Sequence, residues 1–79
     1  KYPQILTNLE VTNAESILAN KKFKNSCEKV QKEISEFDGK ILVRKSGTES
    51  LLRILVEAKD SKVTEIHSKQ LTDLAKDLS

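Results

Sequence analysis

Aromatic residues are scarce in this chain, which has one tyrosine, two phenylalanines and no tryptophan among 79 residues. Proteins that read single-stranded nucleic acids by base stacking need several exposed aromatic rings. The formal net charge is only +2, whereas nucleic-acid-binding domains usually carry a larger and clustered basic excess. Both shortages argue against a nucleic-acid reader, and we expect no nucleic-acid partner.

Cysteine and long apolar runs are equally scarce. The single cysteine, Cys27, excludes an intrachain disulfide, which fits a reducing compartment. No run approaches the roughly 18 apolar residues of a membrane-spanning helix, and no signal peptide opens the chain. We therefore expect a cytoplasmic protein without a membrane partner. Because the chain starts without methionine, directly at a strand-like pattern, we also expect it to be a piece of a longer protein.

Groups that could carry out catalysis are few. His67 is the only histidine, and its place beside Ile66 in a helical pattern indicates a structural or surface role. Cys27 lies in an apolar helical stripe and is expected to be a small core residue. Asp73 and Asp77 are four residues apart on a helix, where a solvated face explains them. We find no Cys/His cluster with metal-ligand spacing and no nucleophile–base pair, so the sequence predicts a binding domain with no metal site.

The pattern of apolar residues predicts strands and helices in the order β-α-β-β-α. Residues 4–12 alternate as in a half-buried strand, and residues 13–20 predict a connector with at most a turn of helix. Residues 21–37 have apolar positions spaced by 4, 3, 4 and 3, which predicts an amphipathic helix. Asp38-Gly39 should end it, with the glycine in the left-handed conformation.

The second half of the chain predicts a hairpin and a final helix. Residues 40–45 and 51–59 have strand-like patterns separated by a short loop, residues 46–50, so antiparallel pairing is expected. A helix capped by Asp60 or Ser61 should then run to about Leu78. Its expected buried stripe is apolar and comprises Val63, Ile66, Leu71, Leu74, Ala75 and Leu78. This order of strands and helices predicts a single α+β domain over residues 1–79, in which an antiparallel sheet has two helices on one face.

Positive charge gathers around the predicted hairpin loop. Within residues 40–53 four cations stand against one acid. The simpler interpretation is a hairpin tip with solvated cations. The other is a phosphate site, because backbone amides near a glycine, hydroxyls and guanidinium groups all suit a phosphate dianion. Its candidate residues are Arg44, Lys45, Ser46, Gly47, Thr48, Glu49 and Arg53. Glu49 is turned away, bonded to an arginine, or placed to meet a substrate hydroxyl.

Residues 39–60, "GKILVRKSGTESLLRILVEAKD", resemble the C-terminal phosphate-binding segment of the α-D-phosphohexomutase superfamily. The pattern of that superfamily is roughly G-R-[VI]-L-[VL]-R-x-S-G-T-E-P-x-x-R-[VIL]-x-V-E. Lys45, between Arg44 and Ser46, resembles the phosphoglucosamine mutase branch. Ser50 replaces the usual proline, which should loosen the loop exit, and Lys40 replaces the commoner arginine with little expected effect. The rest of the chain is similar to the last domain of the family, a TATA-binding-protein-like fold.

The resemblance implies a role within a four-domain mutase that interconverts glucosamine 6-phosphate and glucosamine 1-phosphate, on the way to peptidoglycan precursors. Such an enzyme works through an active-site phosphoserine with magnesium as its cofactor. The last domain holds the phosphate that is not transferred, which assigns this role to Arg44, Ser46, Gly47 and Thr48, with Lys45 and Arg53 beside them. Neither the phosphoserine loop nor the magnesium loop has a counterpart here, so the chain should bind no cofactor and be inactive alone. Its partners would be the sugar phosphate and the other domains.

Three alternatives stay open on the sequence. The chain could be the C-terminal domain of a phosphomannomutase or phosphoglucomutase, with a different hexose phosphate as substrate. It could bind the backbone of a nucleic acid through the same basic loop. It could also be a structural domain whose charged hairpin binds nothing.

Overall fold

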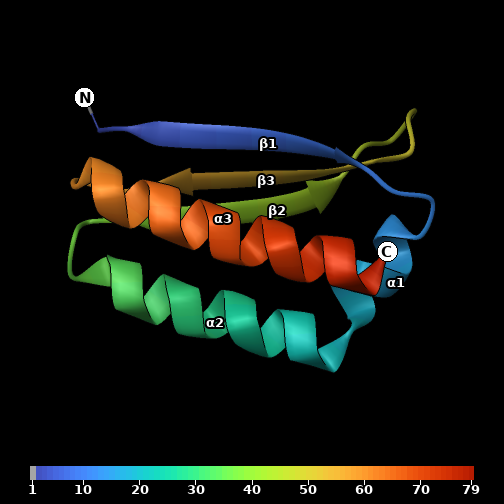
Figure 1. Ribbon diagram of the computed structural model, residues 1–79, viewed down its shortest axis with the longest axis horizontal. Helices are drawn as coiled ribbons and strands as arrows, with labels where there is room; N and C mark the ends of the chain where they lie inside the picture. Colours follow the sequence, from blue (N-terminus) through green and yellow to red (C-terminus); the bar gives the residue numbers. More distant parts are fainter. Residues whose placement is uncertain (1) are drawn as a thin grey trace.

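The computed structural model describes residues 2–79. The strands are β1 (Gln4–Glu10), β2 (Lys40–Lys45) and β3 (Leu51–Glu57), and the helices are α1 (Ala14–Ala19), α2 (Lys21–Ser35) and α3 (Ser61–Leu78). The strands form one antiparallel sheet in the order β1-β3-β2, and both long helices lie against one face of it (Figure 1). The predicted α+β fold and hairpin are therefore confirmed. The predicted connector contains a short additional helix, α1, near one end of the sheet.

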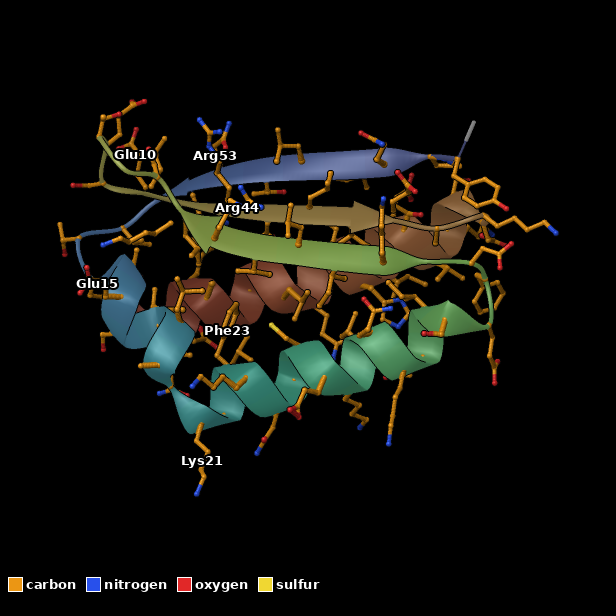
Figure 2. The ribbon with its side chains drawn as sticks, turned by 180° about the vertical axis from the view of Figure 1, so that it is seen from behind. Glu10, Glu15, Lys21, Phe23, Arg44 and Arg53 are labelled. Atoms are coloured by element: carbon orange, nitrogen blue, oxygen red, sulfur yellow. The ribbon has the colours of Figure 1, made fainter. Side chains whose placement is uncertain are left out.

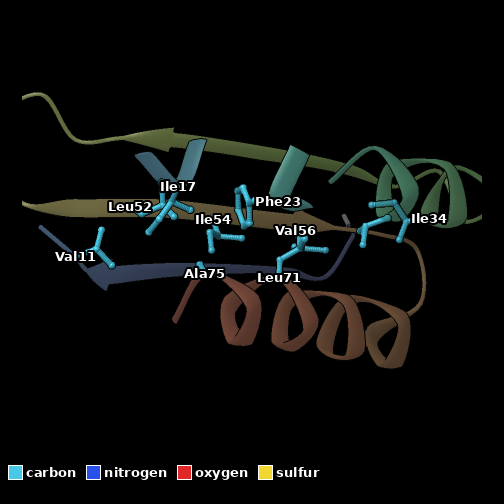
Figure 3. Close-up of a cluster of buried hydrophobic side chains, with 10 residues drawn as sticks. Val11, Ile17, Phe23, Ile34, Leu52, Ile54, Val56, Leu71 and Ala75 are labelled. Carbon is cyan, nitrogen blue, oxygen red and sulfur yellow. The ribbon is translucent and has the colours of Figure 1, made fainter. Parts of the chain in front are cut away.

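The core lies between the central strand and the helices (Figure 3). Strand β3 has neighbours on both sides, so its inward-facing residues are covered completely. Full burial of such an aliphatic side chain stabilises the fold by about 1.5–3 kcal/mol. The core residues are Val11, Ile17, Phe23, Val30, Ile34, Leu52, Ile54, Val56, Leu71 and Ala75.

The buried stripe of α3 agrees only in part with the predicted one. Leu71 and Ala75 are buried as expected, and Val63, Leu74 and Leu78 pack partly buried against the core. The other buried positions are Thr64 and Ser68. Ile66, expected in the core, is 62% exposed. The apolar residues alone do not identify the buried face of α3, because two of its buried positions are Thr64 and Ser68. Small side chains of this kind allow a helix to pack closely against a sheet. Thr64 is satisfied in place, since its hydroxyl donates to the carbonyl of Asp60 at 2.9 Å.

The turn after α2 also differs from the prediction. The helix ends at Ser35, and the left-handed residue is Asp38 with a φ of 53°, while neither glycine has a positive φ. Gly39 is needed for a different reason, because the chain passes close to the end of α2 there. A Cβ at this position would lie 2.7 Å from the carbonyl oxygen of Ile34. The predicted left-handed glycine cap is therefore wrong, although a glycine is still required.

Strand β2 forms one edge of the sheet, and α2 covers the start of that edge. The side-chain amide of Gln31 accepts a hydrogen bond from the Ile41 N–H at 3.0 Å and donates to the Gly39 carbonyl at 3.1 Å. An exposed strand edge otherwise presents unpaired backbone groups to other chains. The amide of Gln31 therefore takes the place of a neighbouring strand at this end of β2.

Candidate functional site

The candidate site is the β2–β3 loop, residues 46–50, with the strand ends beside it. The Ser46 N–H donates to the carbonyl of Leu51 at 3.0 Å, and the Glu49 N–H lies 3.4 Å from the Ser46 hydroxyl oxygen. Among residues 2–79 only Asp38 has a positive φ, so the loop lacks the left-handed residue of an anion nest. Hydroxyl groups, backbone amides and the neighbouring cations are the donors that this loop offers.

Arg44 and Arg53 lie side by side on the open face of the sheet. They are direct partners in the β2–β3 pairing, and both are exposed. Figure 2 shows them on the side of the sheet away from the helices. Within residues 2–79 neither guanidinium forms an ion pair with an acid. Since like charges on paired strand residues are destabilising, this arrangement stores repulsion that a bound anion would relieve.

Lys45 lies on the opposite face of β2 from Arg44. Successive residues of a strand point to opposite faces, and the Lys45 ammonium donates a hydrogen bond to the carboxylate of Glu15 in α1. This hydrogen bond, together with the charge of Lys45, lowers the pKa of Glu15 below its ordinary value. Among residues 2–79, Lys45 is thus the one predicted cation that forms an ion pair with another part of the domain.

The remaining predicted residues lie at the exposed loop tip. Gly47, Thr48 and Glu49 are all exposed, and Ser46 is half-buried. A Cβ built on Gly47 would meet no heavy atom of the described residues within 4 Å. No ion pair joins Glu49 to an arginine in the part of the chain that the structure describes. The geometry therefore brings Arg44 and Arg53 together on the open face beside the loop, whereas Lys45 lies beside the loop on the other face, toward α1.

Sequence reasoning missed the segment that faces the loop from the other side, residues 11–15. Together with residues 45–50 it lines a polar depression of about 390 Å³, on the Lys45 side of the loop, and neither Arg44 nor Arg53 belongs to this lining. The Val11 N–H donates to the Ser50 carbonyl at 3.0 Å. These contacts join segments that are far apart in the sequence, so no local sequence pattern predicts them.

The side chains that were considered for catalysis, His67, Cys27 and Asp73, each contact other residues of the domain. The Nδ1 atom of His67 lies 2.8 Å from the Val63 carbonyl oxygen, and its Nε2 atom lies 3.8 Å from Glu33 of α2. Cys27 packs partly buried against the core, and this burial raises the pKa of its thiol. Asp73 pairs with Lys69 on the surface of α3. Cys27 thus lies beside the core and is not fully buried in it, and the expected non-catalytic roles of the histidine and the cysteine stay predictions.

Residues 2–79 contain neither a cluster of metal ligands nor a helix that could span a membrane. No group of three or more His, Cys, Asp or Glu side chains could hold a metal ion there. None of the helices formed by these residues has the length and apolar character needed to cross a bilayer.

Comparison with known proteins shows which domain family the chain resembles. Residues 6–74 match the model of the phosphoglucomutase/phosphomannomutase C-terminal domain family. The chain is 42% identical to a phosphoglucosamine mutase of Bacillus licheniformis over 96% of its own length and 17% of that protein. It is 43% identical to a phosphoglucosamine mutase of Limosilactobacillus fermentum over 95% of its length and 16% of that protein. The chain thus spans about a sixth of these relatives.

A solved structure agrees with these similarities. A crystal structure of N-acetylglucosamine-phosphate mutase, a member of the α-D-phosphohexomutase superfamily, in its product complex superposes with a TM-score of 0.74. The sequence identity is 25%, and the match covers 94% of this chain and 15% of that one.

Proposed function

Because the chain belongs to the family of the phosphoglucomutase/phosphomannomutase C-terminal domain, we propose that it binds the phosphate of a hexose phosphate. Arg44 and Arg53, with the 46–50 loop, form the site. The observation that carries the proposal is the pair of adjacent arginines without an acidic partner among residues 2–79. Guanidinium groups bind phosphate oxygens through two parallel hydrogen bonds, and the hydroxyl groups of Ser46 and Thr48 add donors.

The chain acts, in this proposal, as one domain of a four-domain phosphoglucosamine mutase. Support comes from relatives of that name at about 42% identity over nearly all of the chain. The substrates are then glucosamine 6-phosphate and glucosamine 1-phosphate, and the domain alone is inactive. Since residues 2–79 offer no cluster of metal ligands, the ligands of a catalytic magnesium ion would come from the other domains.

The chemistry of the site suits a reaction in which the sugar must be held in two orientations. The arginines and hydroxyls contact only phosphate oxygens, so they bind the phosphate whether it is on one end of the sugar or the other. Glu49, exposed at the loop tip, is the group that could meet a sugar hydroxyl. A loop that closes over the substrate also excludes water, which would otherwise hydrolyse a phosphoenzyme.

An amide NMR titration of the 79-residue chain with glucosamine 6-phosphate tests the proposal. We expect a dissociation constant on the order of millimolar, with shifts confined to residues 44–53. Glucosamine without phosphate, at equal ionic strength, is the control and should give no shifts. Equal shifts from both sugars would contradict phosphate binding, and so would the absence of shifts both here and in a full-length mutase containing this chain. Tight, steeply salt-dependent binding of an oligonucleotide would favour the nucleic-acid alternative instead.

The substitution Gly47→Ala separates a binding role of the glycine from a structural one. The added methyl group meets no atom within 4 Å and needs no unusual backbone conformation, so the free energy of unfolding should rise or stay level. We expect weaker sugar-phosphate binding, because the methyl group occupies space in which a ligand would approach the backbone. Urea unfolding and the same titration measure both effects. A loss of stability without a change in affinity would show that Gly47 serves only the fold.

A further inference from the structure

Both ends of the candidate loop are held by the same segment, residues 11–15. At the start of the loop, the Lys45 ammonium pairs with the carboxylate of Glu15. At its end, the Val11 N–H donates to the Ser50 carbonyl at 3.0 Å. The loop is therefore tied at two points to a part of the chain far away in sequence.

This segment is itself fixed to the domain. The side chain of Val11 is buried in the core, as is that of Ile17 in the following helix. The Asn13 side-chain amide donates to the Leu78 carbonyl at the end of α3 at 3.0 Å. Glu15, labelled in Figure 2, is thus carried by an element whose position is set by the core, although its own side chain is exposed.

The end of β2 has little other support. It is an edge strand with a partner on one side only. Gln31 covers the outer edge near Ile41, at the other end of the strand. At the loop end, the partly buried Val43 packs against the core, and the Lys45–Glu15 pair is the side-chain hydrogen bond that joins this end of β2 to a helix within residues 2–79. Lys45 itself lies on the face opposite to Arg44 because successive strand residues alternate.

We propose that Glu15 is a positioning residue for the phosphate site. By pairing with Lys45 on the helix side of β2, it fixes the end of the strand, and with it the direction of Arg44 and of the Ser46 amide. The inference rests on the proposed function of the loop. It makes Lys45 a support of the site and not a ligand of the phosphate.

The direction in which one substitution changes phosphate affinity shows whether Lys45 supports the loop or binds the phosphate directly. Glu15→Gln removes a negative charge near the loop, so it should strengthen phosphate binding if Lys45 is a direct ligand. If the pair positions the loop, Glu15→Gln should weaken binding of glucosamine 6-phosphate by about two- to fivefold, the range of an exposed ion pair. Lys45→Gln should weaken it equally, and the double variant should be no worse than either single variant. Exchanging the charges, Glu15→Lys with Lys45→Glu, should restore part of the affinity.

A second readout does not require ligand. Hydrogen exchange at the Ser46 amide, bonded to Leu51, and at the Val11 amide, bonded to Ser50, should become about two- to fivefold faster in Glu15→Gln. Glu65→Gln is the matched control, because this exposed glutamate of α3 has no ion pair within residues 2–79. Unchanged exchange at both amides would overturn the inference, and so would tighter or unchanged phosphate binding in Glu15→Gln.

The Arg44→Gln variant, titrated beside these, separates this inference from the proposed function. If Arg44→Gln loses affinity while Glu15→Gln does not, the site stands and the positioning role of Glu15 is wrong. If Arg44→Gln keeps the affinity of the unmodified chain, the loop is not the proposed phosphate site and both ideas fail.

Discussion

Replacing Arg44 or Arg53 with glutamine is expected to lower sugar-phosphate affinity by about 10- to 100-fold without destabilising the fold. Removing a charged hydrogen-bond donor to an anion weakens the binding free energy by about 1.5–3 kcal/mol, which corresponds to this change in the dissociation constant. The same substitution relieves repulsion between two like charges on paired residues of β2 and β3. The free energy of unfolding should therefore stay level or rise by a few tenths of a kcal/mol. Affinity is measured by the amide titration and stability by urea unfolding.

The prediction combines a loss of sugar-phosphate affinity with an unchanged or raised free energy of unfolding. Replacing a residue that serves only the fold would lower the free energy of unfolding, whereas replacing either arginine should lower the affinity alone. Lys40→Gln is the matched control, since it removes one positive charge from the same face of β2, at the end away from the loop. An equal loss of affinity in Lys40→Gln would show a general effect of net charge. A clear loss of stability in Arg44→Gln would show that the arginine serves packing.

The hairpin could be predicted because two independent signals agree on it. β2 is a short apolar run and β3 has an apolar face with a period of two, while the short Ser-Gly loop leaves room only for antiparallel pairing. Placing Arg44 opposite Arg53 follows from the same pairing. The period of two also assigns Lys45 to the other face. The sequence prediction grouped Lys45 with the arginines because it counted charges within the loop and not the face to which each points.

Other features could not be predicted, for physical reasons. The face of α3 was assigned from its apolar residues, whereas Thr64 and Ser68 are buried because their hydroxyls are tolerated where a helix packs closely. The contact of Glu15 with Lys45 joins residues 30 positions apart. Such pairs depend on how α1 packs near the end of the sheet. No local propensity encodes that placement.

Gly39→Ala should be the most destabilising single substitution outside the central core. The methyl group would lie 2.7 Å from the Ile34 carbonyl oxygen and 2.8 Å from two carbons of the Ile34 side chain. That side chain is completely buried, and the Gly39 N–H is bonded to the same carbonyl at 2.8 Å. Neither neighbour can move aside without disturbing the core. Overpacking of this kind typically lowers the free energy of unfolding by about 1–3 kcal/mol, and we expect the upper half of this range.

Asp38→Gly is the matched comparison for this prediction, since the two positions are adjacent in one turn. Asp38 has the left-handed conformation, with a φ of 53°, which costs a residue other than glycine about 1 kcal/mol or more. It also accepts a hydrogen bond from the hydroxyl of the exposed Tyr2 at 2.8 Å. Relief of the strain should offset loss of this surface bond, so urea unfolding should give Asp38→Gly a free energy close to that of the unmodified chain. If Asp38→Gly were the more destabilised of the two, the hydrogen bond between Asp38 and Tyr2 would outweigh both the strain at Asp38 and the close contact at Gly39. Equal and small effects at both positions would instead show that the end of α2 can move, because only a fixed Ile34 makes the added methyl group unfavourable.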